Sequence, residues 1–120
     1  MTYGPNTNGS GGSYFSFVES QVAYIVQIVE WLASSKAGAV EPRRDRFEEY
    51  NSELDQRLDR MVWAHPNVHS YYRNDRGRIT TNRPWNVVDY WSMLKSADTN
   101  DFELELREQV PAGLANARQF

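Results

Sequence analysis

The chain has 120 residues, no cysteine and a formal net charge of −3, and its length fits one domain. The lack of cysteine excludes disulfides, cysteine-ligated zinc and thiol catalysis, and the mild acidity disfavours a dedicated nucleic-acid binder. No apolar run reaches the roughly 18 residues of a membrane span, and no signal-like segment opens the chain. We therefore expect a cytoplasmic protein. Its aromatic content of 13% predicts that most of the chain packs against something.

Residues 1–13 are rich in glycine, asparagine and serine, which predicts a loop. From Tyr14 to about Ala33 the sequence is apolar, and Ser13 is a candidate N-cap whose hydroxyl would accept from the first helical turn. Apolar residues follow two sides of this helix, with Phe15, Val18, Val22, Ile25, Val29 and Leu32 on one and Phe17, Tyr24, Ile28 and Trp31 on the other. Because a surface helix needs only one apolar face, we predict that this helix packs inside a larger body.

The middle of the chain predicts a linker and then a second helix. Ser34 to Val40 forms the linker, and Pro42 suits the first position of the helix. The helix carries one apolar and one charged face, and it should end before Pro66. This pattern is typical of an amphipathic surface helix.

After residue 69 the pattern changes. Segments 70–73 and 78–81 are strand-like and flank turn residues, which predicts a β-hairpin. A short helix opened by Pro84-Trp85 follows, and then an edge strand from Phe102 to Leu106 in which apolar and acidic residues alternate. We expect the tail, 107–120, to be mobile.

The glycine-rich loop before the first helix has two interpretations. Amide groups at a helix N-terminus are unpaired and can hold an anion or a polarised carbonyl. The loop is neither a P-loop nor a GxGxxG fingerprint. From these residues alone, a flexible loop is the favoured interpretation.

Two other groups of residues also have two interpretations each. His65 and His69 have metal-ligand spacing, but Pro66 breaks the helix that would align them, which favours exposed loop histidines. Four arginines on the predicted hairpin could meet a 2′-phosphate or another anion, although a solvated surface is the simpler interpretation. These four are Arg73, Arg76, Arg78 and Arg83.

Short motifs in a fixed order run through almost the whole chain. They are Tyr3-Gly4-Pro5-Asn6-Thr7-Asn8, Val18-Glu19-Ser20-Gln21-Val22, Ser70-Tyr71-Tyr72, Gly77-Arg78, Thr80-Thr81-Asn82, Pro84-Trp85 and Asp89-Tyr90-Trp91. The set resembles the late segment of Baeyer–Villiger and related class B flavin monooxygenases. No single motif is specific, but the order is.

The resemblance implies an α+β fragment with two long helices, a C-terminal β-hairpin and a short helix, derived from the fold with two dinucleotide-binding domains for FAD and NAD(P). Its parent would use NADPH to reduce FAD and would oxygenate a ketone or a heteroatom of a small-molecule substrate through a flavin peroxide. Residues 1–13 would be a flavin-side loop, 14–106 the C-terminal helical and hairpin segment, and 107–120 a tail.

The family's two GxGxxG fingerprints and the motif between them are not in the chain. We therefore expect a C-terminal piece without catalytic residues of its own. It would need the N-terminal dinucleotide-binding domains of the parent, bind no cofactor by itself and be inactive alone.

The resemblance also implies site residues. On the cofactor side these are Asn6, Thr7, Asn8, Ser13 and Tyr14. The backbone at Ser13 and Tyr14 would offer N–H groups to the pyrimidine edge of the flavin, where they stabilise negative charge. Ser70 and Tyr71 would lie near the nicotinamide cofactor or the substrate entrance. Many members of the family have tryptophan at the position of Tyr71.

Two alternatives stay open. One is a stand-alone interaction module that buries the first helix against a second copy of itself. The other is a subunit of a split monooxygenase, whose activity would return on mixing with an N-terminal partner.

Overall fold

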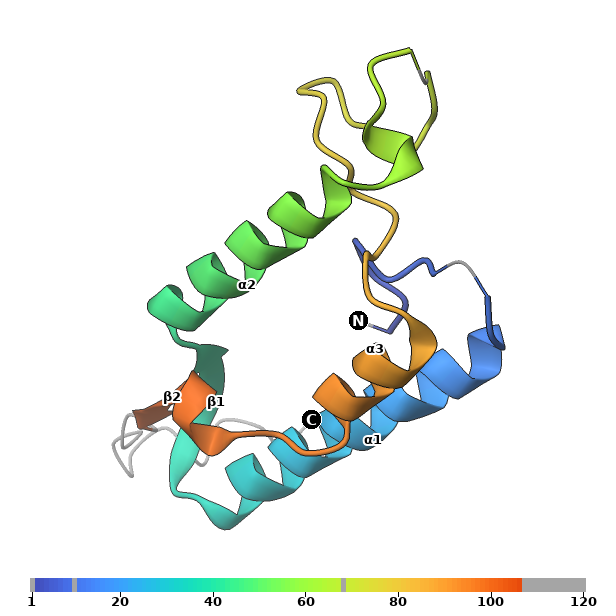
Figure 1. Cartoon of the computed structure of the whole chain (residues 1–120). Coiled ribbons are helices and arrows are strands. Elements are labelled where there is room, and N and C mark those ends of the chain that lie inside the picture. Colours follow the sequence, from blue (N-terminus) through green and yellow to red (C-terminus); the bar gives the residue numbers. More distant parts are fainter. Residues whose placement is uncertain (1, 10, 68, 107–120) are drawn as a thin grey trace, which may run out of the picture.

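The computed structural model describes residues 2–9, 11–67 and 69–106, so the predicted tail, 107–120, lies outside the described residues. The helices are α1 (Tyr14–Ser34), α2 (Arg44–Leu58) and α3 (Val87–Leu94), with 3₁₀ turns at Val62–Ala64 and Thr99–Asp101. The strands are β1 (Ala37–Pro42) and β2 (Phe102–Leu106). The predicted α+β class is confirmed (Figure 1).

Helix α1 begins and ends where the sequence predicts. It starts at Tyr14, and at its end the N–H of Ser35 donates to the carbonyls of Trp31 and Leu32. Helix α3 lies beside α1, whereas α2 runs apart from both and is joined to them through the strands at one end (Figure 1). The radius of gyration is 18.8 Å, against about 14 Å for a compact domain of this length. The chain is therefore less compact than a typical domain of its length.

The predicted linker, Ser34 to Val40, is wrong in part. Ala37–Pro42 is strand β1, which pairs antiparallel with the predicted edge strand β2. Pro42 therefore ends a strand instead of opening a helix, and α2 begins at Arg44. The N–H of Arg43 donates to the carbonyl of Asp101 at 2.8 Å, which fixes the start of α2 next to β2.

The predicted β-hairpin is also wrong in its strands. Residues 74–77 form the expected turn, but 70–73 and 78–81 meet in a single antiparallel bridge, Arg73 to Ile79, and neither is a strand. The N–H of Thr80 still donates to the carbonyl of Tyr72. A longer ladder does not form because the carbonyls of Thr80 and Thr81 accept hydrogen bonds from the N-terminal loop instead.

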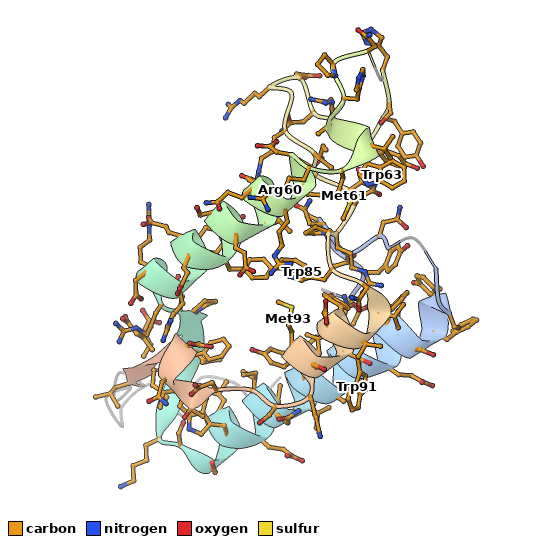
Figure 2. The ribbon with its side chains drawn as sticks, viewed as in Figure 1. Arg60, Met61, Trp63, Trp85, Trp91 and Met93 are labelled. Carbon is orange, nitrogen blue, oxygen red and sulfur yellow. The ribbon has the colours of Figure 1, made fainter. Side chains whose placement is uncertain are left out.

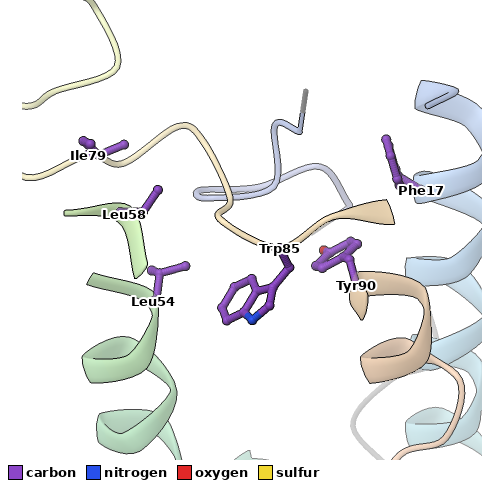
Figure 3. Packing of buried hydrophobic residues seen from close by; sticks show 6 residues of the cluster. All are labelled: Phe17, Leu54, Leu58, Ile79, Trp85 and Tyr90. Atoms are coloured by element: carbon purple, nitrogen blue, oxygen red, sulfur yellow. The ribbon is translucent and has the colours of Figure 1, made fainter. Parts of the chain in front are cut away.

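The buried core is small and links α2 to the other two helices. It consists of Phe17, Leu54, Leu58, Ile79, Trp85 and Tyr90. Trp85 lies between the two leucines of α2 and Tyr90 of α3 (Figure 3). Pro84 and Trp85 precede α3, whose N-cap is Asn86; its side chain accepts from the N–H of Asp89 at 2.9 Å. The packing of Trp85 therefore fixes where α3 begins.

Helix α1 leaves one of its two apolar sides uncovered. Phe17 is buried, but Phe15 is 73% exposed and Val29 56% exposed, and Val22 and Ile25 are also exposed. The described part of the chain therefore does not cover the helix, as the two-sided pattern predicts. Within that part, no helix is long and apolar enough to cross a membrane.

Tyr50 of α2 stacks on Trp85, with ring centroids 5.3 Å apart. Burial of the phenol, together with the nearby Tyr90 and Glu53, raises the pKa of Tyr50 to about 12. Between pH 10 and about 12 the unfolded chain loses this proton and the folded chain keeps it, so stability should fall as pH rises through that window. Urea unfolding across the window checks this. Tyr50→Phe should flatten the slope, and an equal slope in both proteins would contradict the assignment.

Candidate functional site

The N-terminal loop, Tyr3 to Gly9, is bound to the segment that follows the 74–77 turn. The N–H of Asn6 donates to the carbonyl of Thr80 at 2.9 Å, and the N–H of Asn8 donates to the carbonyl of Thr81 at 3.1 Å. Asn8 also accepts from the N–H of Arg83 at 2.8 Å. The loop thus runs alongside residues 80–83 as an extra extended segment, parallel where Asn8 meets Asn82.

Side chains of the loop strengthen this attachment. Asn6 is buried, and its Nδ2 donates to the carbonyls of Ile79 and Asn82, each at 2.9 Å. Asn8 donates through Nδ2 to Oδ1 of Asn82 and accepts from the hydroxyl of Tyr3, each at 2.8 Å. The hydroxyl of Thr7 donates to the carbonyl of Gly4. The amides of these two asparagines hold the loop in position.

Gln21 is a buried polar residue in the middle of α1, and it connects three parts of the chain. Its Oε1 accepts from the N–H of Tyr3 at 2.7 Å, and its Nε2 donates to the hydroxyl of Tyr90 at 2.8 Å. The loop, α1 and α3 therefore meet at one side chain. The motif Val18-Glu19-Ser20-Gln21-Val22 contains Gln21 without indicating this role; the signal for it is a lone amide on an otherwise apolar side of the helix.

The start of α1 has no side-chain cap. Ser13 is the N-cap, as the sequence predicts, but its hydroxyl accepts no hydrogen bond from the first turn, so this part of the prediction is wrong. The carbonyl of Ser13 accepts the N–H of Phe17 at 3.4 Å. The amide groups of the first turn, including that of Tyr14, are thus left without a serine acceptor, an arrangement that suits an anion or a carbonyl from outside the chain.

Two glycines with positive φ lead into this helix, Gly11 at 88° and Gly12 at 85°. A Cβ on Gly12 would lie 2.9 Å from Cζ of Phe17 and 3.1 Å from Cγ2 of Val87, whereas a Cβ on Gly11 would meet nothing within 4 Å. Gly11→Ala should therefore lower the free energy of unfolding only through the strain of an alanine at positive φ, by about 1–2 kcal/mol. Gly12→Ala should lower the free energy of unfolding by about 1–3 kcal/mol more, because the added Cβ overpacks against Phe17 and Val87. Urea unfolding of both variants measures the difference, and equal losses would contradict the contact with Phe17.

Ser70 and Tyr71 lie away from the helix start. The hydroxyl of Ser70 accepts the N–H of Tyr72 at 3.1 Å, and Tyr71 is 80% exposed with its ring on that of Tyr72. In the described part of the chain, neither residue forms a hydrogen bond or a ring contact with Ser13 or Tyr14. Tyr72, the next residue, reaches a pocket that Asn8 and Gly9 also line. The two predicted groups of site residues thus approach each other through Tyr72.

That pocket has a volume of about 340 Å³ and lies between the end of α2 and the segment before α3. Met61 and Trp63 line it from the α2 side and Trp85 from the other (Figure 2). Arg83 also lines it and is buried, so the interpretation of a solvated arginine is wrong at this position. Arg76 and Arg78 are exposed, as that interpretation expects, and Arg78 pairs with Asp55 at 3.0 Å. His65 and His69 are exposed as well.

The "Uncharacterized monooxygenase y4iD" of Sinorhizobium fredii is 42% identical over 103 residues, which is 85% of this chain and 16% of that protein. The "FAD-binding monooxygenase ktnD" of Aspergillus niger is 33% identical over 109 residues, 88% of this chain and 18% of that protein. A Baeyer-Villiger monooxygenase of Pseudomonas aeruginosa is 28% identical over 102 residues, 84% of this chain and 19% of its own length.

The chain is homologous to a segment of monooxygenases, among them proteins named as FAD-binding and as Baeyer-Villiger monooxygenases. The resemblance drawn from the ordered motifs is thereby confirmed. The chain spans between 16% and 20% of the length of the curated relatives that it matches. No family model matches it, and no solved structure matches it significantly.

Proposed function

We propose that the chain is the C-terminal segment of an FAD- and NADPH-dependent monooxygenase that oxygenates a ketone or a heteroatom. The observation that carries this proposal is the uncapped start of α1, which follows a loop held in place by Asn6, Asn8 and Gln21. The similarity to relatives named as FAD-binding and Baeyer-Villiger monooxygenases supports the choice of cofactor.

The residues at the start of α1 fit a flavin. When bound, FAD supplies the redox chemistry and the activation of oxygen. The chain supplies amide donors at Ser13 and Tyr14, which the Ser13 hydroxyl does not cap, and the positive end of a 21-residue helix dipole. Both favour negative charge on the pyrimidine edge of a reduced flavin. Asn6, Thr7 and Asn8 would lie on the flavin side of the loop. Because the side-chain amides and the backbone N–H groups of the two asparagines are engaged within the chain, these two residues would hold the loop in place beside the flavin.

The uncovered side of α1 would face the dinucleotide-binding domains of the parent. Phe15, Val22, Ile25 and Val29 expose apolar surface along this side over about four turns. Exposed apolar patches of this extent mark interaction surfaces. If the rest of the enzyme covers this side of α1, the start of α1 would lie at the flavin. Ser70 and Tyr71, which belong to the same segment, would then lie near the substrate entrance or the nicotinamide cofactor.

The test is a chimera in which this chain replaces the matching segment of the Sinorhizobium monooxygenase. Tyr14→Pro removes one amide donor but keeps the helix, because proline is tolerated at the first helical position and Ser13 already has the extended backbone (φ −81°, ψ 131°) that precedes proline. Tyr14→Ala is the matched control, since it removes the ring and keeps the donor.

We expect the chimera to retain FAD and to oxidise NADPH. Tyr14→Pro should lower the reduction potential of the bound flavin relative to Tyr14→Ala, because the reduced, negatively charged form loses a donor. A chimera that folds and docks the chain but has equal flavin potentials in the two variants would refute the role of the helix start.

The dimeric module is the second candidate, because a second copy could also cover the exposed side of α1. Sedimentation of the chain separates the two. A stable dimer with cooperative unfolding, together with a chimera that retains no FAD, would favour the module over the monooxygenase segment.

A further inference from the structure

Arg83 alone among the described residues combines a formal charge with burial, at 4% exposure. Its guanidinium carbon lies 3.8 Å from the ring centre of Phe17 and 4.2 Å from that of Tyr90. Among the described residues, neither Nε nor Nη1 has a hydrogen-bond acceptor. The two rings offset part of the cost of burying the charge, but they supply no negative charge.

The N-terminal loop packs closely against this guanidinium. A Cβ on Gly9 would overlap Nε and Nη2 of Arg83, so the loop can approach this closely only with glycine there. Burial lowers the pKa of Arg83, and the nearby Tyr90 and Tyr3 offset this only in part. Buried charges in proteins are normally paired, because an unpaired one costs several kcal/mol. The arrangement therefore calls for an anion.

Arg83 is one of the residues that line the pocket of about 340 Å³. Three of its lining residues are aromatic, Trp63, Tyr72 and Trp85, and Asn8 and Asn82 line it as well. Of the described residues that line it, none is acidic and Arg83 is the one cation. A single positive charge matches a monoanion better than a phosphate dianion, and flat aromatic walls match a flat ring.

We propose that this pocket binds an aryl carboxylate, with its carboxylate toward Arg83 and its ring against the tryptophan and tyrosine walls. A guanidinium and a carboxylate form strong charge-assisted hydrogen bonds, and a buried site strengthens them. Nothing in this site depends on the flavin. Binding by the chain thus tests this proposal, and the flavin content of the chimera separately tests the proposed function.

The experiment is calorimetric titration of the 120-residue chain with benzoate, benzamide and acetate. Benzamide keeps the ring and shape without the charge, and acetate keeps the charge without the ring. Benzoate should bind saturably and at least about tenfold more tightly than either, which corresponds to about 1.4 kcal/mol. Arg83→Met should remove this preference for benzoate over benzamide. Arg76→Met, which changes an exposed arginine outside the pocket, should leave it intact.

Three outcomes would overturn the proposal. The first is equal affinity for benzoate and benzamide in the unchanged chain, a comparison that stands even if Arg83→Met fails to fold. The second is a benzoate preference that survives in a folded Arg83→Met variant. The third is benzoate binding by the chain but not by the chimera, which would mean that a carboxylate side chain of the larger enzyme occupies the pocket.

Discussion

Leu58→Ala is expected to lower the free energy of unfolding by about 2–5 kcal/mol, the usual loss when a fully buried leucine is truncated. Leu58 is 2% exposed and belongs to the small cluster that joins α2 to Ile79 and Trp85. With so few buried side chains, no neighbouring layer can collapse into the cavity. Since the cluster is the main contact between α2 and the other helices, its loss should separate α2 from α1 and α3.

The measurement is urea unfolding followed by tryptophan fluorescence, which senses Trp85 in the same cluster. Phe47→Ala is the matched control, because Phe47 lies on the same helix but is 59% exposed, and surface truncations cost about 0.5 kcal/mol or less. Equal shifts of the urea midpoint in the two variants would show that the core does not lie where the structure places it.

Helix α1 and strand β2 could be predicted from the sequence because their signals are local. The apolar periodicity from Tyr14 onward predicts α1 within one residue of its observed end, and the alternation from Phe102 predicts β2. Strand β1 has no such signal. Ala37 to Val40 contains a glycine and small residues with weak strand preference, and this segment is extended because β2 lies beside it.

The errors at the hairpin and at Arg83 share a physical cause. The backbone of Thr80 and Thr81 was predicted to pair with the preceding strand, but their carbonyls accept from Asn6 and Asn8, more than 70 residues earlier in the chain. Arg83 is buried because Phe17 and Tyr90, on two different helices, close over it. Both depend on contacts between segments far apart in sequence, which local patterns do not encode.

The same distinction applies to the candidate site. The predicted residues Asn6, Asn8, Ser13 and Tyr14 do lie on one loop leading into one helix, because they are close in sequence. The residue that ties this loop to the rest, Gln21, acts through Tyr90, and only the folded chain brings these two side chains together. Sequence motifs therefore located the loop, and the structure shows what holds it.

Val22→Glu is expected to abolish FAD retention in the chimera, with at least about a tenfold loss of bound flavin, while leaving the fold of the chain itself intact. Val22 lies on the uncovered side of α1 and is 44% exposed, so a carboxylate at this position can reach solvent in the chain by itself. If this side docks onto the dinucleotide-binding domains, the charge becomes buried without a partner, which costs several kcal/mol.

The matched control is Ala23→Glu, which adds the same charge at an exposed position about 100° further round the helix, on the side of Glu19 and Glu30. Flavin absorbance after gel filtration measures retention, and far-UV circular dichroism of each chain checks the helix. Loss of flavin with Val22→Glu but not with Ala23→Glu assigns the docking surface to the apolar side. Equal retention in both would mean that this side stays in solvent in the enzyme. Conversion of a dimer of the chain to a monomer by Val22→Glu, with flavin retained in the chimera, would assign the surface to a second copy instead.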